Sequence, residues 1–588
     1  MAVAPESTES TSGVNFHRGW LFLAFLALIA IFFVFNRGAY KGYFPDDDLD
    51  NMGNARGIDG AYIVKSLLTP ALNTANFRPA AFLYYFVMVR KAAFHFSSYI
   101  AVLHFFHLLN AWLLWCLARK LGLDVWQAGA AVFFFALHMA AFDIYWKPMY
   151  VFDLLCGTFA LATLNLYLRG WLLMSILTFW LAFKCKEIVI LFPVALAACE
   201  WMFGRPERLR WLKLLPFFAI SLSFGLQALA NNPEPGNNYH LQLTAAALWK
   251  TFSFYSSQWF LVPKLGLGVV LLLLFVKDAR VRFGLLLLIV LSAPMLILPE
   301  RLFAAYIYVP LIGLAIALGT LVRGKIGIAV ALLFFAAWLP WDHSRMRANR
   351  KTALAAADEA RAWVEAATTW ATAHPAITTY LYDGAPVNMG YHGLRGSLIN
   401  LNPRVVPDVL PAEGDLKDVW KRPNIALLVW DSTKRSLSIV ERGTGAPDAS
   451  YIMVGPAMPV WQFGSGWMAR EGQYRWAKPE ATARLHRPEG AREFEAVLVL
   501  SPAYLEAVKS AELTILLNGE EVAKRTFVKS GWLVERWPIP LRPAGPVEVT
   551  FRISPIFHPN AEDKTVEYGM PFAGFGFVTA GTGTSHAP

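Results

Sequence analysis

Apolar residues in this chain come in long blocks separated by short charged segments, up to about residue 341. A helix needs about 20 apolar residues to cross the hydrocarbon core of a bilayer, and about eleven blocks approach that length. They predict an α-helical polytopic membrane protein. The blocks cover residues 19–36, 98–118, 125–142, 150–168, 170–184, 187–203, 214–230, 256–276, 282–298, 303–321 and 324–341.

The pattern changes after the last block. Residues 342–449 combine an alanine-rich stretch of helical period with short apolar runs, which predicts a small α/β segment. From 450 to 588, period-two runs alternate with turns, as is typical of a β-sandwich or jelly roll. Asn518 and Gly519 lie between two such runs and predict a hairpin.

Polar segments flank the first block. Together with the later blocks, the first block predicts a membrane domain over residues 19–341. Residues 1–18 are rich in Ser, Thr and Glu and predict a disordered N-terminus. The block runs on into Asn36-Arg37-Gly38 without a small-residue cleavage site, so we expect a span rather than a cleaved signal peptide. The loop over 37–97 holds two amphipathic stretches, 54–68 and 80–96, which we expect in the membrane interface.

Loop charges predict an orientation. Lys and Arg gather in alternate loops, as at Arg119-Lys120, 205–213 and Arg323-Lys325, and the positive-inside rule makes these loops cytoplasmic. The N-terminus is then cytoplasmic, whereas the 37–97 loop and residues 342–588 are extracytoplasmic. This bias accounts for the net charge of +11, so we expect no nucleic-acid partner. The four cysteines all fall in apolar blocks, which excludes a disulfide scaffold.

Three adjacent carboxylates, Asp46, Asp47 and Asp48, follow the first block. Such a run repels itself and cannot pack into an apolar core. Four uses stay open: a metal ion, a general base, a cationic substrate group, or solvation at the start of a helix.

Other polar side chains near apolar blocks gather on the same predicted face. A charged group at the bilayer centre costs roughly 2.5–3.5 kcal/mol, so it usually lines a cavity or has a partner. Cations beside a carboxylate suit a phosphate-bearing substrate, because Arg and Lys bind the phosphate while the acid deprotonates a hydroxyl. The candidates on that face are Arg78, Asp143, Lys147, Asp153, Lys184, Lys186, Glu187 and Arg301. Further candidates near the apolar blocks are His104, His107, Asn110 and His138.

Structural roles compete with these. His104, His107 and Asn110 share one helical face and suit interhelical hydrogen bonds. Lys186 and Glu187 suit an ion pair, with one another or with a neighbouring helix. Five tryptophans of the β region either fill a sandwich core or stack on sugar rings: Trp461, Trp467, Trp476, Trp532 and Trp537.

Several motifs follow the acidic run in a fixed order: Phe77-Arg78-Pro79, His104 to Asn110, Lys184-Cys185-Lys186-Glu187 running to Pro193, and Glu300-Arg301 before Tyr306-Ile-Tyr308-Val-Pro310. Over about residues 19–341, this order resembles the GT-C superfamily of integral-membrane glycosyltransferases, nearest to its protein O-mannosyltransferase-like branch. The chain departs from the pattern in having three aspartates where the family has a pair, and Lys184-Cys185 where small residues usually stand.

The resemblance implies a glycosyltransferase of the bacterial inner membrane. It would move a sugar from a polyprenyl-phosphate donor to a protein, lipid or glycan acceptor on the periplasmic face. Asp46, Asp47 or Asp48 would be the catalytic base, and Arg78, Lys186 and Arg301 would bind the donor phosphate. The cofactor is unknown, and a divalent cation held by Asp46 and Asp47 is one option. The remaining cavity candidates are His107, Asn110, Asp143, Lys147, Asp153, Lys184 and Glu187.

Two other functions stay open. A transporter or flippase of lipid-linked saccharides predicts paired interrupted helices in related halves, and the sequence has no such repeat. A non-catalytic membrane protein with a carbohydrate-binding β domain predicts no need for the acidic run.

Overall fold

A computed structural model divides the chain into two compact units. The membrane unit comprises residues 1–42 and 58–354, and the C-terminal unit comprises residues 43–57 and 355–588. The predicted disordered N-terminus, apart from Arg18, lies outside the described residues, as do Arg205 and Arg208. The structure describes residues 18–71, 77–204, 210–234, 236–386, 389–404, 406–442, 447–456, 458–559 and 566–579.

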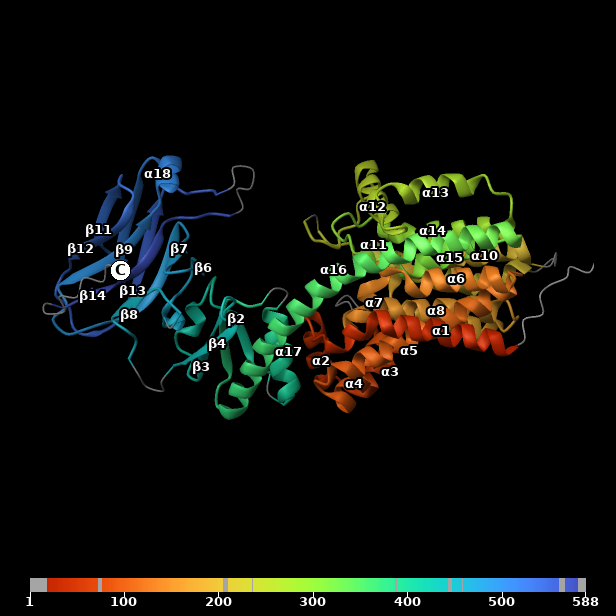
Figure 1. The fold of residues 1–588 in the computed structure, drawn as a ribbon. Helices are drawn as coiled ribbons and strands as arrows, with labels where there is room; N and C mark the ends of the chain where they lie inside the picture. Colours follow the sequence, from red (N-terminus) through yellow and green to blue (C-terminus); the bar gives the residue numbers. More distant parts are fainter. Residues whose placement is uncertain are drawn as a thin grey trace, which may run out of the picture. The chain divides into compact units, whose positions relative to one another are not determined.

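The described part of the membrane unit is helical. Several of its long helices lie side by side in Figure 1. The last helix, α16, continues into the C-terminal unit. The bounds are α1 Arg18–Asn36, α3 Gly60–Leu68, α4 Pro79–Ala92, α5 Phe96–Lys120, α6 Val125–Leu137, α7 Phe142–Trp146, α8 Val151–Tyr167, α9 Leu172–Cys185, α10 Phe192–Phe203, α11 Leu215–Ala230, α12 Ala245–Gln258, α13 Leu265–Leu274, α14 Ala279–Leu296, α15 Tyr308–Thr320 and α16 Gly324–Ala373.

Small residues let some of these helices approach closely. Gly284 of α14 faces Gly313 of α15, and a Cβ on Gly313 would lie 2.4 Å from the Gly284 carbonyl oxygen. In lipid there is little hydrophobic drive between helices, so close backbone packing of this kind supplies much of their attraction.

Six described helices are long and apolar enough to cross a membrane, or seven if the bent pair Val125–Leu137 and Met139–Trp146 counts as one span. The apolar helices Leu172–Cys185 and Ala304–Thr320 are shorter. The helical membrane region is thus confirmed, whereas a count of eleven spans stays a prediction.

The predicted block at 256–276 was wrong as one helix. Helix α12 ends at Gln258 and α13 begins at Leu265. Pro263 lies in the break, and Leu261 and Lys264 on either side of it have positive φ, so the chain turns there.

The predicted amphipathic helix over 54–68 is two helices. Helix α2 spans Asp46–Gly57 and belongs to the C-terminal unit, whereas α3 belongs to the membrane unit. The break falls at Asp59, whose side chain caps α3 by accepting from the Ala61 N–H at 3.3 Å.

The C-terminal unit contains a four-stranded sheet in the order β2-β1-β3-β4. Strand β1 pairs in parallel with β2 and β3, and β4 is antiparallel to β3. Helix α17, Tyr391–Leu401, follows β1. The strands are β1 Thr379–Asp383, β2 Asp408–Pro411, β3 Ile425–Asp431 and β4 Ser436–Glu441.

Two further sheets form the predicted β-sheet region. One has the order β11-β10-β13-β8, and the other the order β12-β9-β14-β7-β6 with β5 also paired to β14. Asn518 and Gly519 both have positive φ and join β10 to β11, so the hairpin is confirmed. The strands are β5 Tyr451–Met453, β6 Trp467–Glu471, β7 Tyr474–Ala477, β8 Glu480–Arg487, β9 Glu493–Leu500, β10 Ala511–Leu517, β11 Glu520–Phe527, β12 Gly531–Pro538, β13 Gly545–Ser554 and β14 Pro571–Val578.

Candidate functional site

The Lys186-Glu187 pair is the centre of a charged cluster in the membrane unit. Lys186 follows α9 with extended backbone, φ −164° and ψ 144°, before a short turn over Glu187–Val189. The two side chains have partners on different elements: Lys186 reaches a carboxylate on α8, and Glu187 reaches the guanidinium of Arg78, which precedes α4.

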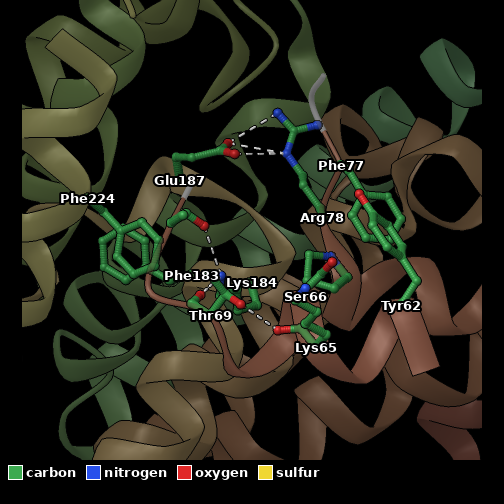
Figure 2. Close-up of a pocket in the computed structure, with 12 residues that line it drawn as sticks. Tyr62, Lys65, Ser66, Thr69, Phe77, Arg78, Phe183, Lys184, Glu187 and Phe224 are labelled. Atoms are coloured by element: carbon green, nitrogen blue, oxygen red, sulfur yellow. Dashed lines mark hydrogen bonds and ion pairs between the residues drawn. The ribbon is translucent and has the colours of Figure 1, made fainter. Parts of the chain in front are cut away.

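Glu187 binds Arg78. The Arg78 Nε lies 3.2 Å from each Glu187 carboxylate oxygen, and Nη2 lies 3.1 Å from Oε2. Figure 2 shows this bidentate pair. Arg78 precedes Pro79, the first residue of α4, where a proline is well tolerated.

Lys186 binds Asp153. The Lys186 Nζ lies 2.6 and 2.7 Å from the two oxygens of Asp153, which is in the first turn of α8 and has a side chain only 3% exposed. The same ammonium lies 4.0 Å from the centre of the Tyr306 ring. Removing a charge this well buried from its partner would be costly, so the pair is a fixed part of the unit.

Arg301 differs from the other two cations. It donates from Nη2 to the Tyr306 hydroxyl at 3.2 Å and lies over the rings of Tyr239 and Phe303, 4.3 and 4.7 Å from their centres. Its Nε is buried without a hydrogen-bond partner among the described residues. No described carboxylate forms an ion pair with it either. Arg301 therefore has hydrogen-bonding capacity for an anion.

Tyr306 joins the two halves of the cluster, because its ring contacts Lys186 and its hydroxyl accepts from Arg301. Lys186 and Arg301, two of the three cations predicted to bind phosphate, thus contact the same tyrosine, and Arg78 is linked to them through Glu187, the chain neighbour of Lys186. Two carboxylates among three cations leave the cluster with one positive charge.

A cavity of about 330 Å³ opens beside the Arg78–Glu187 pair. Lys184 reaches it from α9 and donates to the backbone oxygens of Thr69 and Ala71 at 2.6 and 3.1 Å (Figure 2). Charged and apolar side chains share the wall, which suits an amphiphile. The lining residues are Tyr62, Lys65, Ser66, Thr69, Ala71, Phe77, Arg78, Pro79, Phe183, Lys184, Glu187 and Phe224.

His107 and Asn110 do not line this cavity. His107 bonds the Tyr308 hydroxyl and the Ala136 carbonyl at 2.9 and 3.0 Å, and Asn110 donates to the same hydroxyl at 3.0 Å. His104 likewise bonds the Tyr145 carbonyl at 3.0 Å. All three are buried, so the structure places them in hydrogen bonds between helices, as the structural alternative predicts.

The remaining polar candidates have partners outside the charged cluster. Asp143 and Lys147 form an ion pair at 2.8 Å, with both side chains partly exposed. His138 bonds the Trp259 carbonyl at 2.9 Å. Glu300 pairs with Lys250 at 3.0 Å on the surface, half exposed. None of these three contacts includes a residue of the charged cluster.

The three aspartates open α2 and belong to the C-terminal unit. The Asp46 Oδ1 accepts hydrogen bonds from the backbone N–H of Gly390, at 3.1 Å, and of Gly393. Burial raises the pKa of Asp46, and these hydrogen bonds offset that only in part. Asp48 is fully buried, whereas Asp47 is exposed. The run therefore offers one solvent-facing carboxylate.

Among the described residues, no group of three or more His, Cys, Asp and Glu side chains is placed to hold a metal ion. Backbone N–H groups donate to one oxygen of the Asp46 carboxylate, Oδ1. A divalent cation takes several convergent oxygen ligands, and a cation held by Asp46 and Asp47 stays a prediction.

Most of the tryptophans named in the β region pack inside it. Trp461, Trp467 and Trp537 belong to the buried core, and Trp476 packs on Tyr504 at 5.5 Å between ring centres. Trp532, on β12, is 44% exposed. One exposed indole does not make a sugar-stacking platform, so carbohydrate binding stays a prediction.

No protein-family profile matches the chain, and none of the curated proteins does. The solved structures that the chain resembles include the following three. The arabinofuranosyltransferase AftD from Mycobacteria matches with a TM-score of 0.43 and 11% identity, over 96% of this chain. ArnT from Cupriavidus metallidurans matches over 71% of this chain with a TM-score of 0.40, at 14% identity bound to undecaprenyl phosphate and 16% in the apo state.

The chain spans 60% of the length of the arabinofuranosyltransferase and 94% of the undecaprenyl phosphate-bound ArnT. At these TM-scores and identities, neither the fold nor the activity of this chain follows from the likeness. The O-mannosyltransferase-like branch gains no support and stays a prediction.

Sequence reasoning missed two features of the site. Tyr306 stood in the last motif but had no assigned role, although it joins the two halves of the cluster. The contact of Asp46 with Gly390 and Gly393 was also missed. Its only signal was the glycine spacing at 390–396, because the partners are more than three hundred residues apart in the chain.

Proposed function

We propose that this chain is a membrane glycosyltransferase that takes its sugar from a polyprenyl-phosphate donor. The observation that carries the proposal is Arg301, a cation with unused hydrogen-bonding capacity, in direct contact with a cluster that also holds Arg78 and Lys186. Guanidinium groups bind phosphate oxygens well because they present several donors in one plane. The cavity that Arg78 and Glu187 line has both charged and apolar walls, which suits the carrier of such a phosphate, although Arg301 and Lys186 are not among its lining residues.

In the proposed reaction, an acceptor hydroxyl attacks the anomeric carbon of the sugar. A carbon–oxygen bond forms to the acceptor, and the bond between the anomeric carbon and the phosphate oxygen breaks. That oxygen keeps the electron pair and leaves as polyprenyl phosphate. Arg301, with Lys186 and Arg78 behind it, stabilises the charge that grows on the phosphate, which is where preorganised donors act most strongly.

The hydroxyl proton passes to a carboxylate. The GT-C resemblance places the base in the Asp46–Asp48 run, and we assign it to Asp47. Asp46 accepts two backbone hydrogen bonds and Asp48 is buried, whereas Asp47 is exposed. A base must reach the proton that it takes, so exposure favours Asp47.

The loop charges support transfer on the extracytoplasmic face of the inner membrane. The acceptor is a protein, lipid or glycan hydroxyl. In each case the products are the glycosylated acceptor and free polyprenyl phosphate, which gives the reaction one readout that does not depend on knowing the acceptor.

The test uses the purified full-length chain in lipid nanodiscs with synthetic polyprenyl-phosphate sugars: a pentose, a hexose and an amino sugar. The wild type should release polyprenyl phosphate from at least one donor in the presence of cell-envelope acceptors, and Arg301→Gln should lower that rate about 10²- to 10³-fold. Lys250→Gln, which removes a surface cation near the same loop, should not change it. Intact donors throughout, or equal rates in wild type and Arg301→Gln, would refute the proposal.

A further inference from the structure

Helix α2 is built into the C-terminal unit through a glycine contact with α17. A Cβ added to Gly396 would lie 2.2 Å from the Leu49 carbonyl oxygen, and one added to Gly53 would lie 2.8 Å from the Gly396 Cα. No side chain fits at either position. The two backbones therefore touch at this crossing, which requires glycine on both helices.

Polar contacts fasten the same two helices on either side of the crossing. Asp50 lies 3.4 Å from Arg395 and 3.7 Å from His392. The Arg56 Nε donates to the Asn400 Oδ1 at 2.9 Å. Contacts along the length of α2 fix both its position and its rotation on α17.

Asp46 adds a further contact at the first residue of α2. Its carboxylate accepts from the backbone N–H of Gly390 and Gly393, at the start of α17. A helix N-terminus presents unpaired N–H groups and a partial positive charge, so it is a natural anion site. In this chain the anion is a carboxylate from α2.

The position of Asp46 bears on its neighbour. Asp46 and Asp47 are consecutive residues in the first turn of α2, so they project about 100° apart around the helix axis. When Asp46 is held against α17, Asp47 is turned toward solvent, as its exposure confirms. Losing the Asp46 contact would free the first turn and the direction of Asp47.

We propose that Asp46 is a positioning residue, which anchors α2 to α17 and so holds the neighbouring Asp47 as the base of transfer. The inference rests on the proposed function. Both helices of this contact, α2 with its aspartates and α17, belong to the C-terminal unit.

Two substitutions at Asp46 separate the effect of its charge from the effect of the hydrogen bonds that it accepts. Asn keeps an oxygen that accepts from Gly390 and Gly393 but carries no charge, whereas Ala removes both. The charged and titratable groups facing Asp46 are Asp47, His392 and Tyr382. Since a nearby negative charge disfavours ionisation of a carboxylate, neutralising Asp46 should move the acid limb of the transfer profile to lower pH.

The test measures donor turnover against pH in the full-length protein. Asp46→Ala should lower kcat at least 10-fold with little change in the KM for the donor, Asp46→Asn should keep kcat within about threefold with the acid limb moved to lower pH, and Asp47→Asn should abolish turnover. An acid limb that stays in place in Asp46→Asn would count against its neighbour Asp47 as the titrating base. Wild-type kcat and pH profile in both Asp46 variants would overturn the inference.

A second measurement needs no transfer activity. Gly53→Leu should speed tryptic cleavage after Arg56 in the folded protein, because the added side chain separates α2 from α17. Gly455→Leu, elsewhere in the same unit, is the matched control, since a Cβ there meets nothing within 4 Å. Faster cleavage in Gly53→Leu alone supports the contact even if no donor is ever turned over. Equal cleavage in both variants would overturn the contact whatever the activity.

Discussion

Carboxylates are satisfied differently in the two units. In the membrane unit, the buried Asp153 and the partly exposed Glu187 each face a cation, Lys186 and Arg78. In the C-terminal unit, Asp46 faces backbone N–H groups at a helix start. Arg301 and Asp47 differ from these groups. Arg301 keeps an Nε without a partner among the described residues and Asp47 is exposed, as the proposed roles toward a phosphate and a hydroxyl require.

Breaking the better buried pair should have the largest effect. Lys186→Ala leaves the Asp153 carboxylate buried without its cation, which should cost about 3–5 kcal/mol of folding stability. Thermal unfolding of the purified protein measures this. The double variant Lys186→Met/Asp153→Leu should recover most of the stability but not donor turnover. If Lys186→Ala unfolds at the same temperature as the wild type, the Lys186–Asp153 pair does not stabilise the membrane unit.

The Arg78–Glu187 pair is more exposed, so its loss should cost less, about 1 kcal/mol. Arg78→Met should therefore lower the unfolding temperature of the purified protein by less than Lys186→Ala does. An equal or larger loss in Arg78→Met would contradict this ranking of the two pairs.

Changing Asp46 should have the smallest effect on folding stability, and this effect should depend on pH. Its folded pKa is raised, so its contribution is present below the usual carboxyl pKa and is lost as pH rises through the raised value. Asp46→Asn should therefore be as stable as the wild type at neutral pH, within about 1 kcal/mol, and relatively less stable in acid. A variant that is much less stable at neutral pH but matches the wild type in acid would reverse this sign.

Local patterns predicted much of the fold. Apolar blocks gave α5 and α8 to within a few residues, because a membrane span needs a long continuous run. Asn518-Gly519 predicted its hairpin because positive φ at two successive positions favours these residues. The order of the motifs also placed Arg78, Lys186 and Arg301 together as candidates.

The features that the sequence did not predict depend on contacts between segments far apart in the chain. Nothing near Asp46 indicates that its partners are Gly390 and Gly393, or that α2 belongs with α17. The partners of Lys186 and Glu187 depend on which way each side chain leaves an extended stretch of backbone. The Arg301 Nε has no hydrogen-bond partner among the described residues, and this too depends on its neighbours in space rather than on its motif.

The most direct test of the central claim is equilibrium binding of polyprenyl phosphate to the full-length protein in nanodiscs, measured by native mass spectrometry. The wild type and Lys250→Gln should bind it alike, and Arg301→Gln should bind at least 10-fold more weakly, a loss of about 1.4 kcal/mol. A polyprenyl alcohol without the phosphate should not distinguish Arg301→Gln from the wild type. Equal phosphate binding by the wild type and Arg301→Gln would contradict the account.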